Sequence, residues 1–122
     1  MAEKVDRLTR VNELIKRELA MLFGRGLFSA PGMLVSVTEV VTSVDLRNAT
    51  VRVSIMGGKA SDKENVMHQL EQLRVEFQRE LARNLAFKRT PVLCYKLDRR
   101  FEKGDRVLEL IKEAEKDGAD QQ

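Results

Sequence analysis

Residues 34–55 hold two consecutive runs of β-type sequence, and these runs constrain the fold more than any other part of the chain. In residues 49–55, apolar side chains alternate with polar ones, the period-2 pattern of a strand with one buried and one exposed face. Residues 34–44 are equally rich in Val and Thr, and Asp45 and Asn48 between the runs are residue types that favour tight turns. The sequence therefore predicts a β-hairpin.

The first run contains an irregularity in its alternation. Val35 and Val37 fall in one phase, whereas Val40 and Val44 fall in the other. Either both faces of this strand are partly covered, or a β-bulge lies near Glu39 and Val40. A hairpin alone is only marginally stable, so helices from elsewhere in the chain must cover its apolar face.

Helical periodicity appears on both sides of the hairpin. Apolar residues spaced by three and four over residues 5–22 predict an amphipathic helix, which ends at the glycines that follow Phe23. A long helix is expected over residues 62–87, opened by a capping box in which Ser61 precedes Glu64. Its length, about 26 residues, indicates a kink or a helix–helix junction partway along.

Pro91 is expected to end the long helix, and a third strand follows in residues 92–97. The helical crossover makes this strand parallel to the second one, in a right-handed connection. A last short helix is expected over residues 104–115, and residues 116–122 form a polar tail that we expect to be disordered. The predicted architecture is a single α+β domain over residues 4–115, with a three-stranded mixed sheet and helices on one face.

The sequence gives little support for catalysis. A chain of 122 residues, 43% hydrophobic and 34% charged, is about one globular, soluble domain, and its apolar runs are far shorter than the roughly 18 residues of a membrane span. The one histidine, His68, has no partners at metal-ligand spacing. The lone Cys94 fits a reducing cytoplasm and is expected to be a passive, half-buried thiol. We therefore expect no catalytic residue, no metal, no cofactor and no membrane.

Positive charge is concentrated in one part of the chain, although the net charge is only +3. Residues 79–100 contain seven Lys or Arg against two acidic residues. Such a local excess predicts a surface that binds RNA or DNA, because guanidinium groups match phosphate oxygens in paired hydrogen bonds. The first-choice binding residues are Arg79, Arg83, Lys88 and Arg89, and the second-choice residues are Arg47, Arg52, Arg99, Arg100 and Lys103.

A different class of function stays open at this point. The same cations could form a solvated face balanced by Glu76, Glu80 and Glu102. The chain would then be a protein-interaction module, or a dimer formed through its two amphipathic helices. If the partner is RNA, the lack of an aromatic stacking platform argues against sequence-specific reading of single strands and favours recognition of folded RNA by shape.

Motifs over most of the chain resemble the signature of the bacterial ribosome-binding factor A family. They keep the family's order and spacing from about Val5 to Ile111. The matching motifs are Arg7-x-x-Arg10-x-x-Glu13, Val37-Thr38-x-Val40, Ser43-x-Asp45-Leu46-x-x-Ala49-x-Val51, Arg89-x-Pro91-x-Leu93-x-Tyr95 and Gly104-x-Arg106-Val107.

The resemblance implies a type II KH-like domain that lacks the RNA-clamping Gly-x-x-Gly loop. It implies a non-catalytic, cytoplasmic factor that associates with the free small (30S) ribosomal subunit and contacts 16S rRNA. Such a factor assists late maturation, including processing of the 5′ end of 16S rRNA, and growth in the cold. Where the family usually has Ala-x-Gly at its inter-helix kink, this sequence has Leu73-Arg74-Val75. We expect a monomer.

Overall fold

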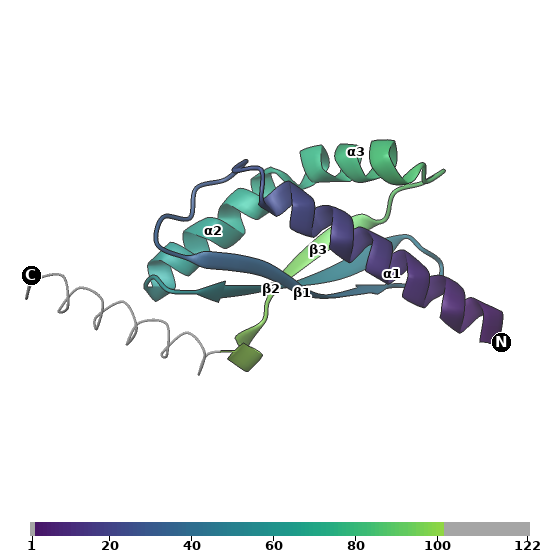
Figure 1. Cartoon of the computed structure of the whole chain (residues 1–122), viewed down its shortest axis with the longest axis horizontal. Coiled ribbons are helices and arrows are strands. Elements are labelled where there is room, and N and C mark those ends of the chain that lie inside the picture. The colour runs from purple at the N-terminus through teal and green to yellow at the C-terminus, as the bar shows by residue number, and fades with distance from the viewer. Residues whose placement is uncertain (1, 102–122) are drawn as a thin grey trace, which may run out of the picture.

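The computed structural model describes residues 2–101, which form a three-stranded sheet with helices on one side (Figure 1). The elements in chain order are α1 (Ala2–Phe23), β1 (Leu34–Thr42), β2 (Asn48–Met56), α2 (Ala60–Gln72), α3 (Arg74–Leu85), β3 (Val92–Leu97) and a 3-10 turn (Arg99–Phe101). Strand β2 is central; it pairs antiparallel with β1 and parallel with β3. The predicted hairpin, helical crossover and mixed sheet are therefore confirmed. The predicted helix over residues 104–115 and the tail over 116–122 lie outside the described residues.

The hydrophobic core lies between one face of the sheet and the three helices. Burying such a side chain fully contributes about 1.5–3 kcal/mol relative to leaving it exposed. The strands supply Val37, Val40, Ala49, Val51, Val53, Ile55 and Leu93, and the helices supply Ile15, Leu19, Leu22, Val66, Leu70, Phe77 and Leu81.

A β-bulge explains the broken alternation in β1. Val37 pairs with Val53, but the next pair joins Glu39 to Arg52, so Thr38 is the extra residue. The bulge switches the phase of the strand and returns Val40 to the core. Of the two explanations that the sequence left open, the β-bulge is therefore correct. It lies at Thr38, one residue before Glu39.

The long helix is divided at Leu73, which confirms the predicted junction. Leu73 has φ −89° and ψ 1°, outside the α-helical region. Backbone hydrogen bonds still run through the break, from Leu73 N to Gln69 O at 2.9 Å and from Phe77 N to Leu73 O at 2.9 Å. The junction therefore forms at Leu73-Arg74-Val75, a segment without glycine or proline.

Both predicted ends of this helical region were wrong by a few residues. Helix α2 begins at Ala60, and its capping interaction runs from Lys59 N to the carboxylate of Asp62 at 2.8 Å, so Ser61 is not the cap. At the other end, α3 stops before Pro91, because Ala86 takes a left-handed conformation with φ 52°.

Candidate nucleic-acid interface

The turn between β1 and β2 lies beside the loop between α3 and β3, at one end of the sheet (Figure 1). The backbone N–H of Val92 donates to the carbonyl of Arg47 at 2.8 Å, and Asn48 pairs with Val92 in the parallel ladder. Arg47 from the hairpin is therefore held next to the loop that carries Lys88 and Arg89. These three cations, separated in the sequence, share one end of the molecule.

The hairpin turn is fixed by side-chain hydrogen bonds. The Ser43 hydroxyl donates to Asp45 Oδ1 at 2.6 Å, and the Arg47 backbone N–H donates to the same oxygen at 3.1 Å. These two hydrogen bonds lower the pKa of the Asp45 carboxyl. Between them, Leu46 has φ 60°, a left-handed conformation that is uncommon for leucine. The turn is thus ordered by its own polar groups and displays Arg47 at the surface.

The loop between α3 and β3 is anchored on both sides of its cations. Phe87 packs against the core, and Pro91 is fully buried. The side chain of Gln78 on α3 accepts the backbone N–H of Leu93 at 3.0 Å, which ties the start of β3 to the helix. Lys88 and Arg89 are exposed between these anchors.

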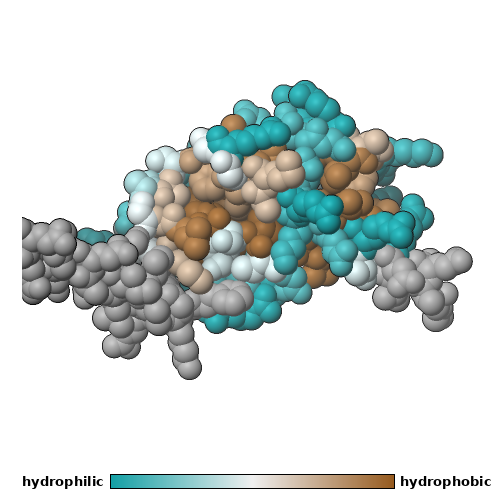
Figure 2. All heavy atoms as spheres, in the orientation of Figure 1, coloured by the Kyte–Doolittle hydropathy of each residue, from teal (hydrophilic) through white to brown (hydrophobic). Residues whose placement is uncertain are grey.

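An open cavity of about 450 Å³ lies at this end of the molecule. We call it the loop-end cavity. Its apolar lining comes from Val11, Leu46, Ala86, Phe87 and Pro91. Its polar lining comes from Arg7, Asp45, Lys88 and Arg89. On the right of Figure 2, where this end of the molecule lies, hydrophobic and hydrophilic surface alternate at close range.

Arg7 is a candidate residue that the charge count missed. It lies far from residues 79–100 in sequence, and α1 brings it to the cavity together with Val11, one helical turn later. Within residues 7–100, no acidic side chain is close enough to form an ion pair with Arg7, Lys88 or Arg89. We call Arg7, Arg47, Lys88 and Arg89 the loop-end cluster.

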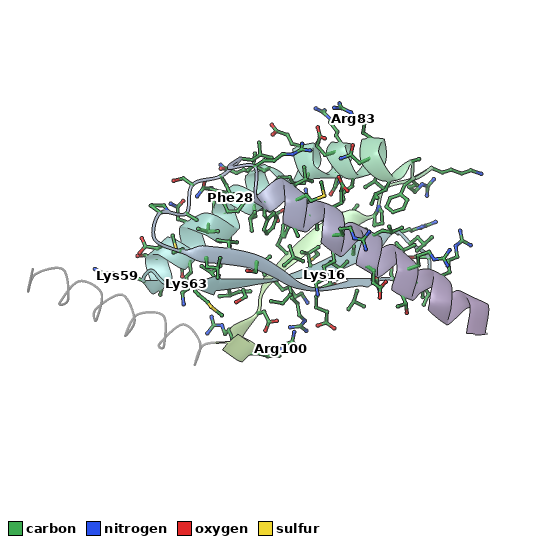
Figure 3. All side chains as sticks on the ribbon, viewed as in Figure 1. Lys16, Phe28, Lys59, Lys63, Arg83 and Arg100 are labelled. Carbon is green, nitrogen blue, oxygen red and sulfur yellow. The ribbon has the colours of Figure 1, made fainter. Side chains whose placement is uncertain are left out.

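Arg79 and Arg83 lie on the exposed side of α3, as the sequence predicted. Figure 3 shows Arg83 pointing away from the sheet. Its guanidinium lies 3.4 Å from Glu80, and Glu80 is also 3.9 Å from Arg25. Exposed pairs of this kind contribute only about 0–1 kcal/mol, so Arg83 can exchange Glu80 for another anion at little cost.

Two of the second-choice residues, Arg52 and Arg100, are bound to acids of this chain. Arg100 contacts Asp98 at 2.6 Å and Glu39 at 3.4 Å, and Arg52 lies 3.4 Å from Glu39. The Asp98 side chain is fully buried, and hydrogen bonds from Arg100 and from the bulge residue Thr38 hold its pKa well below the usual range. These contacts make Arg100 a structural residue that joins β1 to the end of β3.

The candidate residues are therefore divided over the molecule. In Figure 3, Arg83 and Arg100 lie on opposite sides of the sheet. Arg99 is exposed beside a second cavity, of about 440 Å³, whose charged lining mixes Lys63 with Glu64 and Asp98. Lys103 lies outside the described residues. One flat surface cannot engage all of the cations predicted from the sequence.

The groups considered for catalysis are dispersed. His68 is exposed, and Cys94 is also exposed, so the prediction of a half-buried thiol was wrong. In the part of the chain that the structure describes, no three histidines, cysteines or carboxylates cluster as metal ligands would. Over the same residues, no helix combines the length and apolar character needed to cross a bilayer.

Comparison with known families gives the chain its assignment, because the family model for ribosome-binding factor A matches residues 7–111. The chain belongs to the ribosome-binding factor A family. Ribosome-binding factor A of a Synechococcus strain is 40% identical over 114 residues, covering 91% of this chain and 84% of the relative. The ribosome-binding factor A of Acetivibrio thermocellus is 34% identical over 110 residues, covering 89% of each chain.

Solved structures support the same fold. The crystal structure of ribosome-binding factor A from Thermus thermophilus superposes with a TM-score of 0.63 at 20% identity, over 74% of this chain and 94% of the other. A homology model of the Thermus thermophilus factor, fitted into a cryo-EM map of a 30S complex, matches with a TM-score of 0.56 at 23% identity, over 70% and 88% of the two chains. The KH-like fold expected of ribosome-binding factor A is thus confirmed, and the family consists of non-catalytic assembly factors.

Proposed function

We propose that this chain is a ribosome assembly factor that binds the free 30S subunit, with the loop-end cluster in contact with phosphates of 16S rRNA. It acts as a monomer in the cytoplasm and assists late maturation of the subunit, including processing of the 5′ end of 16S rRNA and growth in the cold, while separate nucleases perform the cleavage. The observation that carries the proposal is the cluster of four cations at one end of this member of the ribosome-binding factor A family. Arg7, Lys88 and Arg89 have no ion-pair partner within residues 7–100, and Arg47 has only an exposed contact of 3.9 Å to Asp45.

The electrostatics favour this surface over the rest of the molecule. A guanidinium already bound to a buried carboxylate, as in Arg100, must give up that contact before it can bind a phosphate. Arg7, Lys88 and Arg89 have no such contact to give up among the described residues. Each phosphate contact contributes about 0.7–0.9 to the slope of log K against log salt concentration. Three such contacts predict a slope of roughly −2 to −3 from this surface.

The first test is co-sedimentation of the purified protein with separated 30S subunits, 50S subunits and 70S ribosomes at low and moderate salt. We expect selective recovery with 30S subunits. Equal binding to all three particles that vanishes with salt would contradict the proposal and leave a nonspecific basic protein. A concentration-dependent dimer without ribosome affinity would also contradict it, in favour of the helix-mediated interaction module.

The second test locates the surface by charge reversal. The double variant Lys88→Glu/Arg89→Glu is expected to weaken 30S binding and to flatten the salt slope by about 1.5, because two phosphate contacts are lost. Lys16→Glu/Lys59→Glu is the matched control, since it also reverses two exposed cations and both lie outside the loop-end cluster, as labelled in Figure 3. Arg79→Glu/Arg83→Glu tests α3 separately. If the Lys88/Arg89 variant binds with an unchanged slope, the interface has been assigned to the wrong surface.

A further inference from the structure

We propose that the loop-end cavity binds one unstacked nucleotide of single-stranded RNA, with the base in the apolar part and its phosphates on Arg7, Lys88 and Arg89. This inference rests on the proposed function, which makes RNA the partner. It goes further because charge alone would let this surface bind any phosphate backbone. The inference adds that the surface recognises an unpaired base.

The size and shape of the cavity suit such a ligand. Its volume, about 450 Å³, lies within the range of about 300–1,000 Å³ that is usual for small-molecule sites. A smaller hollow of about 80 Å³ adjoins it, sharing Arg7 and Leu46 and adding the apolar side chains of Leu8 and Val44. The site is open to solvent, as it must be for a nucleotide that stays attached to its neighbours in a strand.

The chemistry of the lining distinguishes a single strand from a duplex. A duplex presents phosphates and would engage the cations, but its stacked bases could not enter a concave apolar site. An unpaired nucleotide offers a planar base beside an anionic phosphate, and the cavity offers an apolar side next to three cations. An acidic peptide matches the cations equally well but leaves the apolar lining around Leu46 and Phe87 uncovered.

The backbone that shapes the cavity is strained in two places. Leu46 and Ala86 are the two non-glycine residues with positive φ in the described chain, and both line this cavity. The two residues belong to different loops, so their presence in one cavity does not result from a single local turn. Backbone held in sparsely populated regions concentrates at ligand sites, where the surrounding structure maintains it. Here both positive-φ residues, one from the hairpin turn and one from the end of α3, line the same hollow.

The second cavity lacks this combination. Its lining mixes acids with cations, since Glu64 and Asp98 lie among Lys63 and Arg99. A nucleotide phosphate there would face the exposed Glu64, whereas Asp98 is already bound to Arg100 and Thr38. The loop-end cavity has one carboxylate, Asp45, whose Oδ1 already accepts hydrogen bonds from Ser43 and the Arg47 backbone.

The test compares three RNA probes by fluorescence anisotropy at fixed salt. They are a mixed-sequence 10-nucleotide single strand, an abasic strand of the same length, and the 10-base-pair duplex. The two single strands carry equal phosphate charge, and the duplex carries twice that charge. We expect the strand with bases to bind about 5- to 50-fold more tightly than the abasic strand, which corresponds to about 1–2.3 kcal/mol for one buried base. Equal affinity for the two strands would overturn the inference. Tighter binding of the duplex than of the base-bearing strand, after normalising each affinity to the number of phosphates, would overturn it as well.

Leu46→Asn is the variant that removes the apolar contact without disturbing the turn, because asparagine tolerates a left-handed backbone. It is expected to abolish the difference between the two strands and to leave abasic binding unchanged. Leu27→Asn is the matched control, as Leu27 is an exposed leucine outside the cavity, and it should leave the difference intact. Retention of the full difference in Leu46→Asn would place the base elsewhere.

The same variants separate this inference from the proposed function. If the wild-type protein co-sediments with 30S subunits but does not distinguish bases from abasic RNA, the nucleotide site is wrong and the assembly-factor proposal stands. If neither RNA nor subunits are bound, both fail. A polyglutamate peptide bound as tightly as the base-bearing strand, and weakened by Leu46→Asn, would show a peptide site and overturn the assignment to RNA.

Discussion

Replacing Ala86 by glycine should stabilise the protein, although glycine substitutions near helices usually do the opposite. Ala86 has φ 52°, and a left-handed backbone costs a residue with a Cβ about 1–2 kcal/mol. Glycine removes this cost, but its greater freedom in the unfolded chain lowers the stability of the folded state by about 0.4–1 kcal/mol. Ala86 is exposed, so little packing is lost. The net expectation for Ala86→Gly is an increase of about 0.5–1 kcal/mol in the free energy of unfolding.

Thermal unfolding followed by circular dichroism is the assay. In a domain of about 100 residues, 1 kcal/mol shifts Tm by about 4–8 °C, so Ala86→Gly should raise Tm by roughly 2–8 °C. Ala82→Gly is the matched control inside α3, where glycine costs about 1 kcal/mol and should lower Tm. If both variants lower Tm to a similar extent, Ala86 is not in the left-handed conformation and the reasoning about the strained cavity fails.

Three other substitutions test separate parts of the structure. Phe77→Ala should cost about 3–5 kcal/mol in chemical denaturation, because the ring is fully buried; a loss below 1 kcal/mol would contradict the described core. The folded-state pKa of Asp98 is depressed below its ordinary value of 3.8, so its stabilisation is complete above that pH and is lost as the pH falls through the folded-state pKa. In the wild-type protein, the urea concentration at the unfolding midpoint should therefore decrease between about pH 5 and pH 2, and in Asp98→Asn it should decrease less. The same decrease in both proteins would show that Asp98 does not cause the loss of stability in acid. Gly58→Ala should lower Tm more than Gly26→Ala, since both have positive φ but only the first places a Cβ 2.7 Å from Met33 Sδ; equal shifts would mean that the steric contact is relieved.

The sequence predicts the sheet well because its information is local there. Alternation in residues 49–55 is enough to define β2. The change of phase between Val37 and Val40 indicated a bulge as one of two alternatives, and the strand register decided between them. Helix ends were predicted less well, because they depend on backbone conformations that composition does not reveal. Ala86 adopts a conformation typical of glycine, and the α2 cap uses Asp62 in place of the expected Ser61–Glu64 pair.

The candidate site was predicted in part, for a different physical reason. Charge density along the chain identified Lys88 and Arg89, but it could not identify Arg7, which reaches them only through the packing of α1. The same count included Arg100 as a second-choice residue, although a buried carboxylate two residues earlier holds its guanidinium. Contacts between residues that are distant in the sequence decide which cations remain available to bind a phosphate. A charge count over consecutive residues does not include these contacts. The spacing of Arg7 and Val11 on one helical face was the signal that could have indicated this residue.

The pairing of Asn48 with Val92 also determines when the loop-end cavity can exist during folding. The β1–β2 hairpin closes a short turn and needs only local chain motion, whereas β3 must wait until α2 and α3 have crossed the sheet. Arg47 can therefore reach its final place in the hairpin early, but Lys88 and Arg89 join it only with the last strand. Nascent chains emerging from a ribosome would carry the loop-end cluster in two incomplete halves until that final step.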